Sequence, residues 1–167
     1  EWFSRPALEK ELKENGIRYV FLGDELGARR EERECYIGLR ADYDLISLTT
    51  AFQSGMKRLR TGREGFRVAL MCSEKEPLDC HRTILVCQHA KHFTNDISHI
   101  HADGRLESHA DAEIRMRSRY IPEEGDLFRS PEELLNLAYK RRGEEINYVE
   151  KPAPSSVLKE DTQNYES

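Results

Sequence analysis

The predicted fold rests on one apolar run, Phe66-Arg67-Val68-Ala69-Leu70-Met71-Cys72. A short continuous apolar run is typical of a buried strand, most often a parallel one. Residues 83–93 follow with a helical pattern, and residues 96–101 predict another strand, which Ala102-Asp103-Gly104 closes. Strand, helix and strand at this spacing predict a βαβ unit with a right-handed crossover.

The segments before this unit extend the pattern. Residues 4–16 combine a serine cap, an early proline and a closing Asn15-Gly16, which predicts a helix. Residues 17–22 are rich in β-branched and aromatic side chains and predict a strand. Residues 23–46 carry charges and glycines without periodicity, which predicts a long surface loop, whereas residues 47–62 return to helical spacing.

The C-terminal part carries one clear helix signal. Ser130-Pro131-Glu132-Glu133 has the form of a capping box with proline at the first helical position. We therefore expect a single α/β domain over residues 1–150, with a mostly parallel, Rossmann-like sheet between helical layers and a helical extension over residues 106–150. Residues 151–167 are rich in proline, serine and acidic residues, which predicts a flexible tail.

Composition excludes several classes of protein. The 167 residues are 38% hydrophobic, which suffices for one core, and their net charge of -5 does not favour nucleic acid as a partner. No stretch approaches the ~20 apolar residues of a membrane span, and residues 1–6 lack the pattern of a signal peptide. The four cysteines are too few for a disulfide scaffold and should stay reduced, so we expect a cytoplasmic protein.

The best functional candidate is the stretch from Cys72 to Arg82. Ligand sites in parallel sheets gather where a strand ends and the next helix begins, and such helix starts favour anions. A thiol there is biased toward thiolate, so Cys80 is the expected nucleophile and Cys72 a further catalytic candidate. His81 could act as general acid or base, Arg82 could bind a carboxylate or phosphate, and Glu74 could orient Arg82 or a proton donor.

Other residues are expected to bind the substrate. Arg29 and Arg30 follow the strand predicted at residues 17–22, so their loop should lie on the same rim as Cys80. His99 lies near the carboxyl end of a predicted strand and could reach the same cluster. Each also has an ordinary alternative, since adjacent arginines are usually solvated and a strand histidine is usually structural.

The cysteines also have structural and metal-binding alternatives. A packing role is about as plausible as chemistry for Cys72, and it is preferred for Cys35 and Cys87. Zinc ligands of the right type are present, but their spacing matches no zinc finger, so no metal is predicted. These candidate zinc ligands are Cys72, Cys80, His81, His99 and His101. A redox pair of Cys72 and Cys80 is possible through the loop, although the stretch is no Cys-x-x-Cys motif.

The sequence resembles domain-of-unknown-function family 488 over roughly residues 1–105. The most specific match is the Cys-x-Glu-x-x-Pro-x-x-Cys-His-Arg pattern within residues 69–82, and the other matching stretches are Gly16-Ile17-Arg18-Tyr19, Leu26-Gly27-Ala28-Arg29-Arg30, His99-Ile100 and Asp103-Gly104. The resemblance implies an α/β fold and a cysteine-centred site, but it supplies no reaction.

The chain departs from this family in two places. The family usually has a further strand and helix, with an arginine-bearing segment, before the part that matches here. Ala28 stands where the family usually has a second glycine, which leaves the backbone less open to a ligand.

Three functions remain open from the sequence. The leading hypothesis is a cysteine-centred enzyme for a small or nucleotide-like anionic substrate. A non-enzymatic module for nucleotide or nucleic acid, with structural cysteines, is the alternative. A metal or redox sensor is the third. The sequence gives no cofactor and no oligomeric state.

Overall fold

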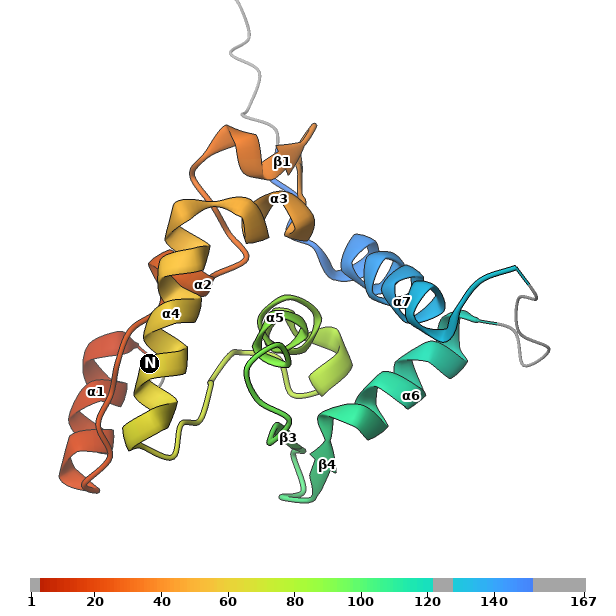
Figure 1. Ribbon diagram of the computed structural model, residues 1–167. Helices are drawn as coiled ribbons and strands as arrows, with labels where there is room; N and C mark the ends of the chain where they lie inside the picture. The colour runs from red at the N-terminus through yellow and green to blue at the C-terminus, as the bar shows by residue number, and fades with distance from the viewer. Residues whose placement is uncertain (1–3, 122–127, 152–167) are drawn as a thin grey trace, which may run out of the picture.

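The computed structural model describes residues 4–121 and 128–151 of the chain (Figure 1). Its α-helices are α1 (Arg5–Glu14), α2 (Gly23–Leu26), α3 (Tyr43–Leu48), α4 (Thr50–Gly65), α5 (Gln88–Ala90), α6 (His109–Tyr120) and α7 (Pro131–Ile146). The other helical segments are the 3-10 helices η1 (Arg33–Cys35) and η2 (Pro77–Asp79) and the π-helix η3 (Arg82–Cys87). The strands are β1 (Tyr36–Ile37), β2 (Arg40–Ala41), β3 (Ser98–Ile100) and β4 (Leu106–Ser108). In Figure 1 the central η3 and α5 lie between α4 and the pair α6 and α7.

The first and last helices begin and end where their local signals predict. Helix α1 has proline in its first turn and ends at Asn15, after which Gly16 takes a positive φ of 71°. At α7 the predicted capping box is confirmed, because the Ser130 hydroxyl accepts from the amide of Glu133 at 3.2 Å. The Glu133 carboxylate accepts from the amide of Ser130 at 2.7 Å in return.

The predicted parallel sheet is wrong. The described residues form two small antiparallel sheets, β1 with β2 and β3 with β4, so the chain has mixed helix and strand content without a Rossmann-like layer. The strand expected at residues 96–101 does exist as β3, but the chain returns at once through a turn. Gly104, with φ of 82°, lies in this turn, and Ser98 pairs with Ser108. The βαβ unit is therefore also wrong, because β3 has an antiparallel hairpin partner.

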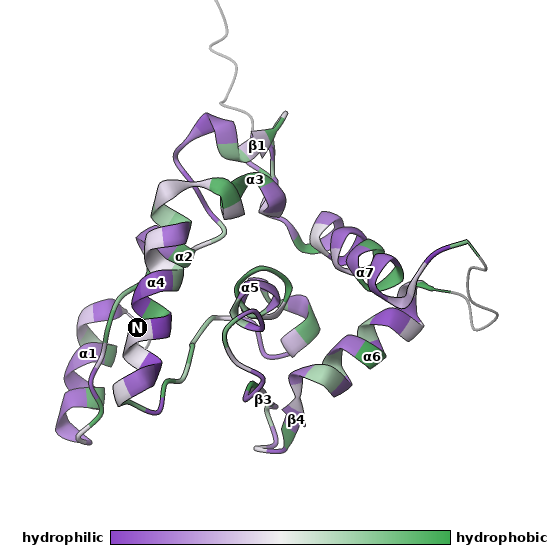
Figure 2. Cartoon of the chain, viewed as in Figure 1, coloured by the Kyte–Doolittle hydropathy of each residue, from purple (hydrophilic) through white to green (hydrophobic). Residues whose placement is uncertain are grey.

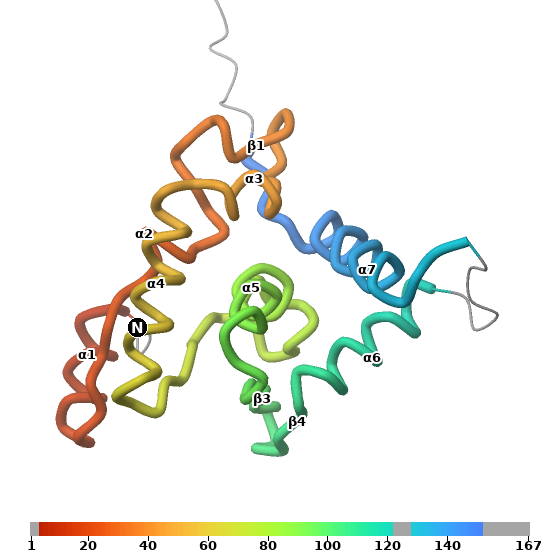
Figure 3. The backbone as a smooth tube through the Cα atoms, in the orientation of Figure 1, coloured from red at the N-terminus to blue at the C-terminus, as the bar shows by residue number. Residues whose placement is uncertain are grey.

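Residues 17–22 and 66–72 belong to no helix or strand, and residues 66–72 form an extended segment between α4 and the central helical part (Figure 1). Figure 3 shows the second of these segments running from the end of α4 to the central helical part of the chain. Apolar and β-branched residues favour an extended backbone, but a strand also needs a neighbouring chain to pair with. The two segments touch through side chains instead, with the Arg18 guanidinium 5.0 Å from the Phe66 ring centroid. Phe66 remains 58% exposed, so this apolar run is not the buried strand that its composition predicts.

Two further segments differ from their predicted structure. Residues 23–46, expected to be a loop, contain α2, η1, both strands of the first sheet and most of α3. This was missed because the elements are too short to show periodicity. The helix expected at residues 83–93 is present in part, since the π-helix η3 runs to Cys87 and is followed by the short α5, which ends at Ala90.

The core surrounds the central helical segment. Figure 2 shows hydrophobic residues along η3, where Ile84, Leu85 and Val86 are almost fully buried. Phe52 of α4 and Met116 of α6 belong to the same hydrophobic core as these η3 residues and are fully buried. In the described part of the chain, no helix has the length and apolar character needed to cross a bilayer. The predicted tail, apart from Lys151, lies outside the described residues.

Candidate active site at the Cys72–Arg82 loop

The loop from Cys72 to Arg82 is shaped by short-range hydrogen bonds. The Glu76 carboxylate accepts from the amide of Leu78 at 3.2 Å and so caps the 3-10 helix η2. The Cys80 carbonyl then accepts from the amides of Thr83 and Ile84, at 3.0 and 3.2 Å, which starts the following helix. These contacts fold the loop back, so that Cys80 lies beside the end of the extended segment.

The Arg82 side chain holds this loop in place by donating hydrogen bonds to three acceptors. Its Nε donates to the Cys80 sulfur at 3.1 Å, and its two terminal nitrogens donate to the carbonyls of Leu70 and Glu74, at 3.0 and 3.1 Å. The main-chain amide of Arg82 also donates to the Cys80 sulfur, at 3.4 Å. Arg82 is therefore occupied in holding the loop, whereas the sequence assigned it to a substrate anion.

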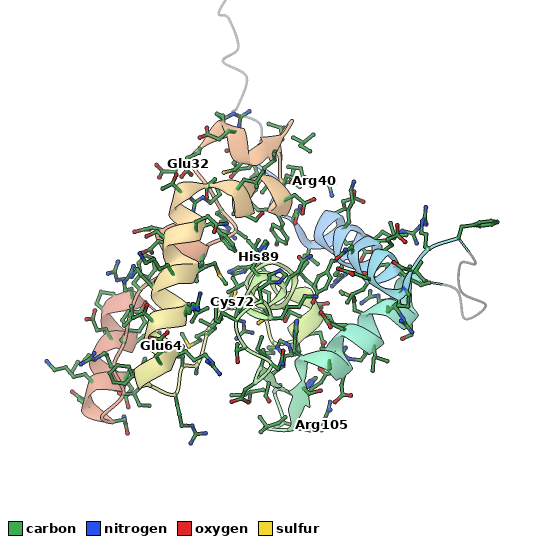
Figure 4. All side chains as sticks on the ribbon, in the orientation of Figure 1. Glu32, Arg40, Glu64, Cys72, His89 and Arg105 are labelled. Atoms are coloured by element: carbon green, nitrogen blue, oxygen red, sulfur yellow. The ribbon has the colours of Figure 1, made fainter. Side chains whose placement is uncertain are left out.

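Two thiols, a carboxylate and an imidazole gather on the inner side of the loop. Cys72 Sγ lies 3.3 Å from His81 Nδ1 and also contacts a carboxylate oxygen of Glu74. The Cys80 thiol lies 3.6 Å from the same carboxylate oxygen. Cys80 is fully buried, whereas Cys72 is half-buried, so Cys72 is the more accessible sulfur. Figure 4 labels Cys72 between α4 and the central helical segment.

The two thiols shift each other's pKa in opposite directions. A hydrogen bond from the Cys80 thiol lowers the pKa of Cys72, against the effect of burial, and His81 lowers it further. The pKa of Cys80 is raised, first by that same hydrogen bond to Cys72 and then by burial.

A cavity of about 440 Å³ opens beside Cys72. Arg29, Tyr43 and Tyr148 line it together with Cys72, Glu74 and His81. The Arg29 guanidinium stacks over the Tyr148 ring, 4.9 Å from its centroid, and Arg29 remains exposed. The cavity therefore joins a thiol and an imidazole of the Cys72–Arg82 loop with the accessible guanidinium of Arg29.

The remaining sequence candidates lie elsewhere. Arg30 is buried and does not line the cavity. It donates to the carbonyls of Asp24 and Glu25 and pairs with Glu32 at 2.7 Å. His99 pairs with His109, with 3.0 Å between the facing ring nitrogens. The structure thus brings Arg29 to the loop but not Arg30 or His99.

Tyr43 and Tyr148 were missed by sequence reasoning. Tyr43 begins α3, directly after the capping residue Asp42, whose carboxylate accepts from the amide of Leu45 at 2.9 Å. That cap was the available signal, but residues 23–46 were treated as a loop. Tyr148 follows α7, and nothing local connects it to the loop some 70 residues earlier.

The same side chains could hold a metal ion. One ligand atom from each of Cys72, Glu74, Cys80 and His81 lies within 4.8 Å of the others. Thiolate, imidazole and carboxylate are the ligands that zinc accepts. The loop thus offers either a free thiolate or a metal-binding set, and the two are separable by experiment.

The described residues combine helices and short antiparallel strands with a cavity that is lined by a thiol, an imidazole and a guanidinium. The family model described as Domain of unknown function DUF488 matches residues 1–88, more than half of the 167 residues. The chain belongs to this family, which confirms the resemblance. The matched part contains the whole loop from Cys72 to Arg82. Searches of curated proteins and of solved structures found no match.

Proposed function

We propose that the chain is a cysteine-dependent enzyme whose nucleophile, Cys72, acts on a small or nucleotide-like anionic substrate in the 440 Å³ cavity. One observation carries the proposal. The half-buried sulfur of Cys72 lines the cavity and lies 3.3 Å from His81 Nδ1. A thiol beside a proton-carrying imidazole is the usual arrangement of an activated cysteine nucleophile.

Cys72 takes the role that the sequence gave to Cys80. Burial of Cys80 removes its sulfur from any substrate, and Arg82 donates two hydrogen bonds to that sulfur. Cys80 then acts as a positioning residue, because its thiol donates a hydrogen bond that favours the thiolate of Cys72. Both cysteines are thus required, but only Cys72 is accessible to a substrate.

Arg29 is the proposed anion-binding residue. Its planar guanidinium suits a carboxylate or phosphate, and the stack on Tyr148 fixes its orientation at the cavity. With the anion held there, the Cys72 sulfur forms a bond to the electrophilic atom, and the leaving group departs with its electron pair. His81 supplies the proton that the leaving group takes up.

A non-enzymatic binding module is the alternative. In that case Arg29 would bind a phosphate and the cysteines would serve only the fold. Binding would then weaken with added salt and would be indifferent to a Cys72→Ser substitution. The enzyme proposal predicts that the same substitution abolishes turnover while anion binding persists.

Protection of Cys72 from alkylation tests the proposal. Native protein is treated with iodoacetamide, with and without inorganic phosphate or a mononucleotide, and each cysteine is followed by mass spectrometry. We expect Cys72 to react first, the anion to slow it, and Arg29→Gln to remove that protection. Arg105→Gln, at an exposed arginine in the β3–β4 turn, is the matched control. A Cys72 that reacts only after a chelator is added would refute the free nucleophile and favour a metal centre.

A further inference from the structure

We propose that Cys87, His99 and His109 form a second site, a buried centre for a borderline-soft divalent metal ion such as Zn²⁺. It is independent of the proposed catalytic loop. Cys87 ends η3, His99 is the middle residue of β3, and His109 begins α6. One ligand atom from each lies within 4.8 Å of the other two, and all three residues are buried. Sequence reasoning gave Cys87 a packing role and did not consider His109.

The donor atoms need little movement to bind one ion. Zinc takes nitrogen and sulfur ligands at about 2.0–2.3 Å, which places tetrahedral ligand atoms roughly 3.3–3.8 Å apart. His99 Nε2 and His109 Nδ1 already face each other at 3.0 Å. The His109 amide donates to the carbonyl of Ile97 at 2.9 Å, which holds the start of α6 against the β3 hairpin. This backbone contact holds His109 beside His99.

The far nitrogen of His109 has the partners that a metal-bound histidine usually has. Its Nε2 lies 3.0 Å from the Tyr139 hydroxyl and 3.5 Å from a carboxylate oxygen of Glu113. The Tyr139 hydroxyl donates to that carboxylate at 2.7 Å, and Lys91 donates to it at 2.8 Å. A carboxylate behind the outer nitrogen fixes the tautomer and directs the other nitrogen to the metal. This leaves the lone pair of Nδ1 facing His99 and Cys87.

Because all three ligands are buried, a metal ion bound between them would be shielded from bulk solvent. Neutral imidazole is the form that binds a metal, and metal binding would displace the thiol proton. The fourth coordination position is left to water or a small ligand.

Metal content and a cobalt spectrum test the site. The full chain is loaded with Zn²⁺ or Co²⁺, dialysed and analysed for bound metal and visible absorption. Because the Cys72 loop could also bind metal, the experiment uses the Cys72→Ala/Cys80→Ala double variant as its background. We expect one equivalent of metal and a sulfur-to-cobalt charge-transfer band in that background, and loss of both on adding Cys87→Ala. Cys35→Ala, at an equally buried free cysteine, should retain them.

A second variant covers the case in which Cys87→Ala does not fold. Glu113→Gln keeps the size of the side chain behind His109 but removes its charge, and should weaken Zn²⁺ binding about 10–100-fold. Glu64→Gln, on the exposed end of α4, should leave binding unchanged. The proposal is overturned if the folded background protein retains no metal, or if the charge-transfer band survives Cys87→Ala.

Discussion

Arg142 of α7 donates from Nε to the main-chain carbonyl of Leu78 at 2.8 Å. The same side chain pairs with Asp79, so α7 is joined to the 3-10 helix inside the candidate site. Its guanidinium is almost fully buried, with 7% of the side chain exposed. A helix beyond the family match therefore supports the loop that the family match contains.

Arg142→Leu should lower the free energy of unfolding by about 1–3 kcal/mol, because the buried carbonyl of Leu78 loses its partner. Urea denaturation measures the change. Lys140→Leu, two residues earlier on the exposed side of α7, should change stability by no more than about 0.5 kcal/mol. Equal effects of the two substitutions would mean that the Arg142 contact does not hold the loop.

Cys72 should alkylate almost as fast at pH 6 as at pH 8.5. The hydrogen bond from Cys80, together with His81, lowers the pKa of Cys72, so its thiolate persists as the pH falls below the usual thiol value. A free thiol with a pKa of ~8.5 would slow roughly a hundredfold over this range. Iodoacetamide labelling read by mass spectrometry gives the profile, and unfolded protein provides the ordinary thiol for comparison.

His81→Gln should restore part of the ordinary pH dependence. The substitution removes the imidazole that helps to lower the pKa of Cys72, so that pKa should rise and labelling at low pH should slow relative to the parent protein. His92→Gln, at a histidine beyond α5 and away from the loop, is the matched control. An unchanged profile in His81→Gln would contradict the role given to the imidazole.

Arg82→Lys should destabilise the protein by about 1–2 kcal/mol although it preserves the charge. A single ammonium group cannot reach the carbonyls of Leu70 and Glu74 and the sulfur of Cys80 at once. Chemical denaturation compares this variant with Arg67→Lys, at an exposed arginine of the extended segment. Arg82 would be an ordinary surface charge if both variants matched the parent protein.

The amides of residues 67–72 should exchange with solvent rapidly despite their apolar sequence. In the described part of the chain these amides have no main-chain acceptor, whereas those of α4 lie in a regular helix. Hydrogen-deuterium exchange followed by mass spectrometry measures both segments in one experiment. Protection of residues 67–72 at the level of α4 would reveal a pairing partner beyond residues 4–121 and 128–151.

The sequence predicted the fold only where local signals sufficed. Helix α1 has a proline in its first turn, although the Ser4 side chain makes no capping hydrogen bond, and α7 has both a capping box and a proline, so their positions followed from nearby residues. A strand depends on a second segment, and the apolar run at residues 66–72 carries no information about whether one is present. The predicted sheet failed for this reason, while β3 was found but its partner β4 was not.

The candidate site was predictable to a similar extent. Cys72, Cys80 and His81 converge because one short loop connects them, and their order in the sequence already placed them together. Arg29 and Arg30 could not be told apart, since their opposite directions are set by packing around α2. His109 was missed because it meets His99 only across the β3–β4 hairpin.

The π-helix η3 carries one residue of each cluster, with Arg82 at its start and Cys87 at its end. In a π-helix the main-chain hydrogen bonds join a residue to the fifth one along, which is the spacing of Arg82 and Cys87, whereas an α-helix joins a residue to the fourth. Arg82 holds the Cys72–Arg82 loop, and Cys87 belongs to the cluster with His99 and His109. An insertion or deletion within residues 82–87 would disturb both at once, so natural length variation should be excluded there and accumulate in the neighbouring turns. Descendants of this chain would then inherit the two clusters together or lose them together.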